Sequence, residues 1–407
     1  MNLFSLSFRY LARRWGSAAL TVLVGAFGLA LLSTVMTMGE DIPAAVKKAL
    51  GGADMVVGPK GSELDLVMCC ALHITPTRGL VPYKDALTAV TNPYVQASVP
   101  IALGDSYNGT RILWTRPDIV GIYGAHLAEG RMWTGAMEAV IGAEAARQQH
   151  LHMGSTMIST HGLDIGGELH TNAHYTVVGI LAPTGTVIDR LVLADLKSIK
   201  VVHVDMSDPD EHGPTQVAGQ GYDADGNPLA ISAMIAKFSS PIAAAIVPRQ
   251  ISTESETLTA ANPLLEMARL SALARPGFNL VMIFGVLFGV IAALMAAIGL
   301  MSALNQRAKD LALLRILGAS RFKVARVAVQ EALIIVHFAY VAGFILALAL
   351  GLLVADKLFS YGLYIEPWAS ARTLLLLYLG ALAAAILASI LPVIRAVTAD
   401  GEGALKA

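Results

Sequence analysis

The sequence predicts an α-helical membrane domain of four transmembrane helices, with a large α+β extracytoplasmic domain inserted between the first and second. The chain is 55% hydrophobic and 14% charged, whereas soluble domains carry about 25% charged residues. Four apolar runs reach the roughly 20 residues that cross a bilayer, and they span residues 16–38, 278–304, 328–355 and 373–394. The intervening stretch, 39–277, is long enough for one or two soluble domains.

Basic residues orient these spans. Arg9, Arg13 and Arg14 precede the first run, and the segment 305–327 carries a cluster of arginines and lysines. Because positive loops stay on the cytoplasmic side, we expect both termini, 1–15 and 395–407, and the segment 305–327 to be cytoplasmic. The region 39–277 and a short loop, 356–372, then lie outside. The first run is too long for a cleaved signal peptide and no small-x-small site precedes Glu40, so we expect it to be retained.

The region 39–277 mixes helix and strand signals. A helix over 41–50 should prolong the first span as a stalk and stop at Gly51-Gly52. A second helix is expected at 143–150, and a third at 262–273 should lead back to the membrane. Short β-branched or apolar segments predict strands at 53–57, 110–115, 139–142, 175–181, 191–193 and within 230–238. The stretch 205–227 is rich in Gly, Asp, Pro and His and is expected to be a loop.

Several chemistries are not expected of this chain. No phosphate-binding loop of the G-x-x-x-x-G-K-[ST] type is present, and Gly58–Ser62 lacks its spacing. There is no G-x-S-x-G elbow and no H-E-x-x-H helix either. We therefore expect no enzyme activity and no cofactor held by this chain. A formal net charge of −1 and the lack of a basic, aromatic-interleaved tract argue against nucleic acid as a partner.

Two ionisable residues fall inside the third span. Such residues are functional candidates in a membrane. Glu331 lies near the inner boundary, where an ion pair with the arginines of 305–327 is the favoured interpretation, and His337 lies deeper, where a neutral imidazole packed against another helix is favoured. No relay of carboxylates crosses the membrane, so proton-driven antiport is not expected.

Metal binding is a weaker hypothesis for the outer region. Of the histidines only His337 lies in a span, and Cys69, Cys70 and His73 offer two or three soft ligands at close spacing. Zinc takes about four Cys or His ligands, and neither this group nor the outer histidine pairs form a four-ligand framework. Those pairs are His150 with His152 and His170 with His174. We expect scattered surface histidines and buried cysteines, and no metal site.

The segment 305–327 is too hydrophobic for a solvated connector. Its stretch Leu313-Leu-Arg-Ile-Leu-Gly-Ala-Ser-Arg321 resembles the signature of the MacB/FtsX/LolC-type ABC transporter permeases (type VII). In that family the signature forms a coupling helix that docks on a separate ATPase. The physical pattern agrees, since apolar residues can enter a groove and Gly318 can end a short helix. The coupling residues so implied are Leu311, Leu313, Leu314, Arg315, Leu317, Gly318, Ala319 and Arg321. Asp310 departs from the family, which often has Glu one position away.

Other segments resemble the same family. Glu138–Ala146 with Met153–Thr156 is similar to the MacB-like periplasmic core, and Val177–Asp189 is similar to a V-V-G-I-L-x-P-T-G-T-x-x-D stretch of one branch. Membership implies a multi-pass protein of the bacterial inner membrane that works as a homodimer or paired with a paralogue. It implies a dimeric cytoplasmic ABC ATPase that binds ATP and Mg²⁺, and leaves a periplasmic adaptor or binding protein open.

Three functions are set against each other. The first is a permease subunit that relays ATP-driven motion to the periplasmic domain (mechanotransmission) to export or extract a lipid, lipoprotein, peptide or hydrophobic molecule. The second is a regulator of a periplasmic partner such as a cell-wall hydrolase. The third is a metal-handling permease that uses Cys69, Cys70 and His73. The large region 39–277 favours the first over the second.

Overall fold

A computed structural model describes residues 12, 15–77, 79–162, 169–202, 221–223, 228–306, 321–360 and 363–398. The chain forms two compact units. The membrane unit comprises residues 1–42, 273–357 and 365–407, and the α+β unit comprises residues 43–272 and 358–364. Most of the predicted loop 205–227 lies outside the described residues.

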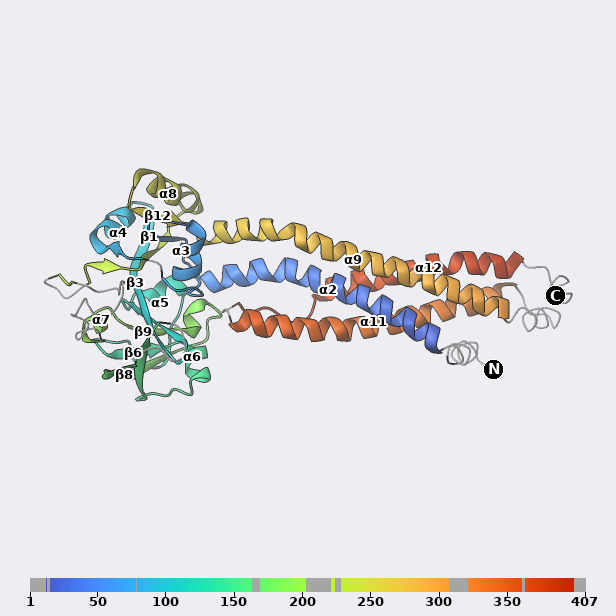
Figure 1. Ribbon diagram of the computed structural model, residues 1–407, viewed down its shortest axis with the longest axis horizontal. Coiled ribbons are helices and arrows are strands. Elements are labelled where there is room, and N and C mark those ends of the chain that lie inside the picture. Colours follow the sequence, from blue (N-terminus) through green and yellow to red (C-terminus); the bar gives the residue numbers. More distant parts are fainter. Residues whose placement is uncertain are drawn as a thin grey trace. The chain divides into compact units, whose positions relative to one another are not determined.

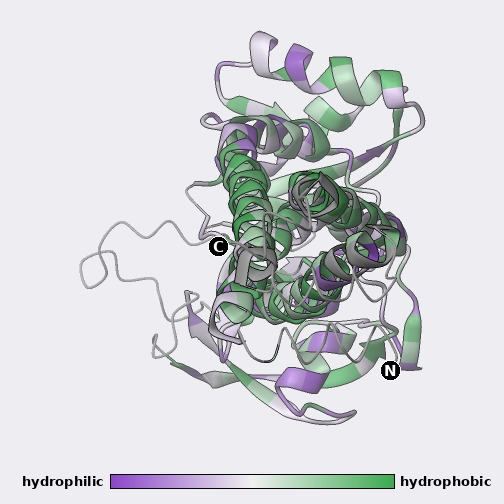
Figure 2. Ribbon diagram, turned by 90° about the vertical axis from the view of Figure 1, so that its right-hand side faces the viewer, coloured by the Kyte–Doolittle hydropathy of each residue, from purple (hydrophilic) through white to green (hydrophobic). Residues whose placement is uncertain are grey.

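Four helices of the described chain are long and apolar enough to cross a membrane: α2 (Trp15–Leu50), α9 (Pro263–Gln306), α11 (Arg321–Ser360) and α12 (Ala371–Thr398). The predicted class, four spans with an α+β domain between the first and second, is confirmed. Viewed along their axes, the ribbons of these helices consist mostly of hydrophobic residues (Figure 2). Such all-round hydrophobicity is expected of helices in lipid.

Glycines let the helices of the membrane unit approach closely. A Cβ added at Gly28 of α2 would lie 2.9 Å from the Gly285 carbonyl oxygen of α9. One added at Gly343 of α11 would lie 2.9 Å from the Ala26 carbonyl oxygen of α2. Because lipid supplies no hydrophobic drive between helices, small residues that permit backbone contact hold such bundles together. In this unit α2 therefore packs against both α9 and α11.

The α+β unit is built on one ten-stranded sheet. Its strand order is β12-β1-β11-β3-β4-β9-β6-β8-β5, with β7 pairing β3 and β8. The strands are β1 (Met55–Pro59), β3 (Val95–Tyr107), β4 (Thr110–Thr115), β5 (Leu127–Gly130), β6 (Glu138–Ile141), β7 (Thr156–His161), β8 (Leu169–Leu181), β9 (Val192–Asp195), β11 (Ala233–Phe238) and β12 (Leu258–Ala261). A separate two-stranded sheet joins β2 (Val81–Pro82) and β10 (Ala230–Ile231).

Strand β3 divides this sheet into two parts with separate cores. Along one edge of β3, residues 95–101 pair with β11 and residues 105–106 pair with β7. Around the first part, β1, β11 and β12 are covered by α4 (Tyr83–Val90) and α8 (Pro241–Glu254). Figure 1 shows these elements on one side of the unit and β6, β8 and β9 on the other.

The second part of the sheet closes into a barrel of six strands. The pairings run β3-β4-β9-β6-β8-β7 and return from β7 to β3. Small barrels are filled by their own side chains, and here Trp114 and Tyr175 are fully buried in the core. Trp114 Nε1 donates a hydrogen bond to the Tyr175 hydroxyl at 2.8 Å. We call the short β3–β7 pairing that completes the barrel the closing seam.

Short helices complete the unit. They are α3 (Glu63–Cys70), α5 (Ile119–Tyr123), α6 (Ala143–Gln148), α7 (Ser198–Val202) and a 3₁₀ turn at Val187–Arg190. The predicted strand 110–115 coincides with β4, and the other five predicted strands overlap β1, β6, β8, β9 and β11. Strands β2, β3, β5, β7 and β12 were not predicted. Neither β3 nor β7 shows a clean apolar alternation.

Candidate functional site

The predicted coupling residues lie outside the described residues, with one exception. Helix α9 ends at Gln306 and α11 begins at Arg321. Arg321 is thus the first residue of α11. Leu311, Leu313, Leu314, Arg315, Leu317, Gly318 and Ala319 lie between the two helices, in the part that is not described. Their role in docking an ATPase stays a prediction.

The two ionisable residues of the third span occupy different environments on α11. Glu331 is buried, with 4% of its surface exposed, and it directly precedes Ala332, which belongs to the core cluster of Leu300, Ala332 and Ala385. His337 lies edge-on to Tyr378 of α12, with ring centroids 6.3 Å apart. This contact supports the packing interpretation of His337. The ion-pair interpretation of Glu331 stays a prediction.

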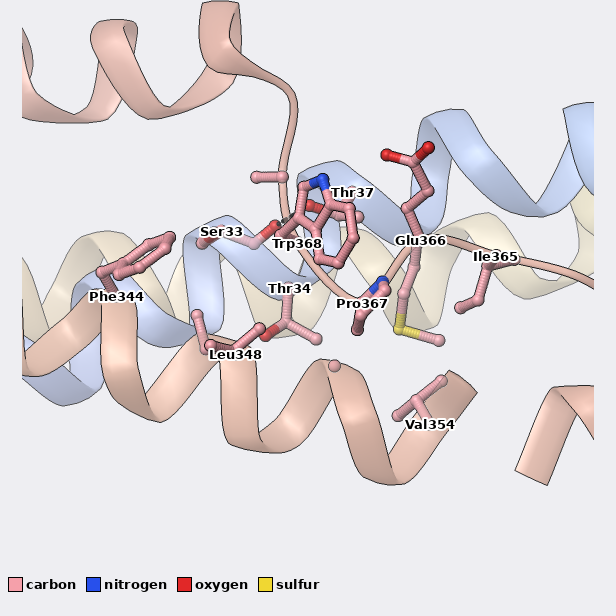
Figure 3. Close-up of a pocket in the computed structure, with 14 residues that line it drawn as sticks. Ser33, Thr34, Thr37, Phe344, Leu348, Val354, Ile365, Glu366, Pro367 and Trp368 are labelled. Carbon is pink, nitrogen blue, oxygen red and sulfur yellow. Dashed lines mark hydrogen bonds between the residues drawn. The ribbon is translucent and has the colours of Figure 1, made fainter. Parts of the chain in front are cut away.

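A small cavity lies among α2, α11 and the loop before α12. It is lined by Ser33, Thr34 and Thr37 of α2, by Leu348 and Gly351 of α11, and by Trp368 of the loop, among others (Figure 3). Its volume of about 20 Å³ has room for roughly one water molecule. Binding sites for small molecules usually measure about 300–1,000 Å³, so this cavity is not a substrate site as it stands.

The end of α2 is held firmly within the α+β unit. The helix stops at Gly51, whose φ of +56° is a left-handed conformation suited to glycine. The Gly52 amide then donates to the Ile122 carbonyl at 3.0 Å. A Cβ on Gly185 would lie 2.6 Å from Lys48 Nζ, so the loop around Gly185 packs directly on the last turn of α2.

A buried carboxylate organises that loop. Asp189 is 2% exposed, and its two oxygens accept bonds from the Thr184 amide at 3.0 Å, the Thr184 hydroxyl at 2.7 Å and the Gly185 amide at 2.7 Å. The P-T-G-T-x-x-D pattern is therefore a self-contained turn. The hydrogen bonds of Thr184, Gly185, Thr186 and Asp189 lie within the pattern and shape its backbone.

The start of α9 is anchored in the same unit. Asn262 accepts a bond from the Leu265 amide at 3.0 Å, which caps the helix, and its amide donates to the Ala244 carbonyl at 2.8 Å. Arg269 pairs with Glu63 of α3 at 3.0 Å and with Glu266 of its own helix. Both helices that connect the α+β unit to the spans therefore have defined attachments within it.

The cysteine cluster is a buried packing site in the described chain. The Sγ atoms of Cys69 and Cys70 lie 3.3 Å apart, and both thiols are free. The hydrogen bond from Cys70, helped by buried Arg111, lowers the pKa of Cys69 to about 7. Burial lowers the pKa of His73 to about 3, so its ring is neutral. Arg111 donates to the Thr75 carbonyl at 2.8 Å.

A different set of ligand-type side chains meets at the closing seam. Among the described residues, Asp105 of β3, His161 of β7 and His170 of β8 alone bring three such atoms within 4.8 Å of one another. Cys69, Cys70 and His73 do not form such a group. Sequence reasoning missed the seam cluster because it paired His170 with His174, whereas His174 is exposed on the strand.

Comparisons with known proteins agree with this architecture. Residues 18–252 match the model of the MacB-like periplasmic core domain, and residues 282–400 match the FtsX-like permease C-terminal domain. No curated protein matches the chain.

Two solved structures are similar to parts of the chain. The periplasmic region of MacB from Actinobacillus actinomycetemcomitans is 10% identical, with a TM-score of 0.35. The match covers 55% of this chain and 95% of the MacB region. The extracellular domain of the noncanonic ABC-type transporter YknZ from Gram-positive bacteria is 12% identical, covers 51% of this chain and 99% of its own, and has a TM-score of 0.28.

The fold and the family matches define the class of protein. The chain belongs to the MacB/FtsX-type ABC transporter permeases, as its sequence predicted. It is thus a permease subunit of an ABC system, the kind of protein that works with a cytoplasmic ABC ATPase. Its apolar helices and periplasmic-type domain fit the bacterial inner membrane.

Proposed function

We propose that this permease relays ATP-driven motion of a separate ATPase to its periplasmic domain, in order to export or extract a lipid, lipoprotein, peptide or hydrophobic molecule. The observation that carries the proposal is the continuity of α2 and α9. Each is one helix from an apolar span to residues anchored in the α+β unit. A helix transmits displacement along its axis because its hydrogen bonds run parallel to that axis.

The remaining parts follow from this proposal. ATP and Mg²⁺ would bind to a dimeric ATPase on the cytoplasmic side, and two permease copies, or a copy and a paralogue, would sit above it. Both chain termini would be cytoplasmic. The cavity among α2, α11 and the loop before α12, at about 20 Å³, is itself too small to hold such a cargo.

The coupling segment is tested by a triple substitution, Leu314→Ala with Arg315→Ala and Leu317→Ala. We expect the purified permease to lose its cognate ATPase, or the ATPase to lose its stimulation, while membrane insertion is unchanged. Arg372→Ala with Leu375→Ala and Leu379→Ala is the matched control, because it removes the same residue types from exposed positions of α12. Equal ATPase retention and stimulation in both variants would refute the coupling assignment.

The relay itself is tested by softening α2. Ala44 and Lys47 are exposed on its last turns, and glycine at each costs roughly 1 kcal/mol of helix stability. We expect Ala44→Gly with Lys47→Gly to keep ATP hydrolysis but to diminish ATP-dependent changes in the distance between spin labels at Lys84→Cys in two copies. Ala245→Gly with Gln250→Gly softens α8 equally and is the control. An undiminished distance change in the α2 variant would overturn the relay.

A further inference from the structure

The closing seam of the barrel brings three metal-binding side chains to one point. We propose that Asp105, His161 and His170 bind one divalent transition-metal ion, with Zn²⁺ the ion that suits them best. This site is separate from the coupling segment and from Cys69, Cys70 and His73. It stands on its own geometry, so it does not depend on the proposed relay.

The distances suit a single ion. His161 Nδ1 lies 3.6 Å from one carboxylate oxygen of Asp105, and His170 Nε2 lies 3.5 Å from the other. Ligands bound tetrahedrally to zinc at about 2.0–2.1 Å are roughly 3.3 Å apart. The three ligand atoms lie within 4.8 Å of one another, so small side-chain rotations are enough to enclose an ion.

The backbone is shaped to place these groups. Residues Asp105 and His161 are direct partners across the β3–β7 pairing. A bulge in β3 lies between Leu103 and Ser106, and the β7–β8 register shifts next to the site. Bulges redirect side chains and occur frequently beside functional sites. The Gly162 amide, at a φ of +82°, donates a hydrogen bond to the Gly104 carbonyl at 2.8 Å. This bond joins the end of β7 to β3.

Charge and burial agree with a cation at this point. The Asp105 side chain is fully buried, whereas those of His161 and His170 are 25% and 12% exposed. A carboxylate this deep is costly unless a cation or several donors compensate it. Ser159, also buried, donates to Asp105 Oδ2 at 2.8 Å, which is the outer contact that typically orients a metal ligand.

The ligand set indicates which metal and what kind of site. Imidazole nitrogens favour zinc and its neighbours over calcium or magnesium, which prefer oxygen. Two histidines and one aspartate leave a fourth position of zinc for water or an outside group. Structural zinc sites are usually closed by four protein ligands. The seam site therefore fits an exchangeable ion that joins β3, β7 and β8.

Metal content of the whole protein tests this proposal. The full chain, with any affinity tag removed, is stripped with EDTA in detergent and equilibrated with buffered free Zn²⁺, and bound zinc per chain is measured by mass spectrometry. We expect about one zinc in the native protein and none in His161→Ala with His170→Ala. Affinity should fall by more than the roughly 10–100-fold that an outer-shell change costs.

Controls separate the seam from other sites. His150→Ala with His174→Ala removes two exposed histidines of the same unit and should keep the zinc. Cys69→Ser with Cys70→Ser should keep it too, and loss of zinc in that variant would overturn the assignment. If the alanine pair fails to fold, His161→Gln with His170→Gln replaces it. Zn²⁺ should raise the melting midpoint of the native protein and of both control variants but not that of the seam variants, and equal zinc content in native and seam variants refutes the site.

Discussion

The Asp189 turn allows a quantitative test of the anchor at the end of α2. Asp189→Ala removes a buried carboxylate that accepts from the Thr184 amide, the Thr184 hydroxyl and the Gly185 amide. Each donor left without a partner costs about 1–3 kcal/mol when buried. Because Thr184 and Gly185 are only partly buried, water recovers part of this, and the expected loss is about 2–4 kcal/mol.

Thermal unfolding of the full chain in detergent measures that loss. Trp114 and Trp133 are buried in the α+β unit, so tryptophan fluorescence follows its unfolding. In a domain of this size 1 kcal/mol shifts the midpoint by about 2–4 °C, which predicts a fall of roughly 5–15 °C. Asp195→Asn is the control, because Asp195 is less buried and its carboxylate contacts the Lys197 amide at an exposed position. Midpoints within 1 °C of each other would refute the reasoning.

Three further predictions concern packing and acidity. Gly28→Leu should destabilise the membrane unit by about 1–3 kcal/mol through overpacking, because the added side chain would meet the backbone of α9. The control Gly16→Leu, at a position with nothing within 4 Å, should not change the melting midpoint. Equal midpoints for the two variants would contradict the packing of α2 on α9. Tyr175→Phe removes the acceptor of Trp114 and should cost about 1–3 kcal/mol, seen as a lower melting midpoint; an unchanged midpoint would show that the bond contributes nothing. Cys70→Ala should raise the pKa of Cys69 from about 7, whereas Cys70→Ser, which keeps a hydrogen-bond donor, should not. Thiolate absorbance against pH measures both pKa values. Coincident titrations would show that the Cys70 hydrogen bond does not lower the pKa of Cys69.

Parts of the fold were predictable because their signals are local. The spans are long apolar runs, and β4 is a short segment in which β-branched and aromatic residues fill four of the six positions. The helix 143–150 begins directly after a short apolar strand, and it was observed as α6. Strand β3 escaped prediction because it serves two cores and one closing seam, and each demands a different side-chain pattern over its length. Strand β7 is short, and its pairing depends on β3.

The candidate sites also divide into one with a local sequence signal and one that depends on contacts between distant segments. The coupling segment is contiguous, so its leucines and arginines were visible as a motif, and its structure lies outside the described residues. The seam cluster joins Asp105 to His161 and His170 across a large sequence separation, through strand pairings that no local pattern reveals. Close spacing singled out Cys69, Cys70 and His73 only as a weaker metal hypothesis, and the fold buries both cysteines as free thiols.

The sequence by itself determined the class of this protein. The length of each apolar span and the basic residues of the loops are local signals that need no tertiary contact. The motif of the segment 305–327 and the P-T-G-T-x-x-D turn also belong to the sequence, since each works within a few neighbouring residues. Tertiary structure alone decided that α2 and α9 are anchored in the α+β unit, that β7 closes a barrel, and that Asp105 meets two histidines. Such contacts depend on strand register and close packing of distant segments, where a shift of one residue sends a side chain to the opposite face.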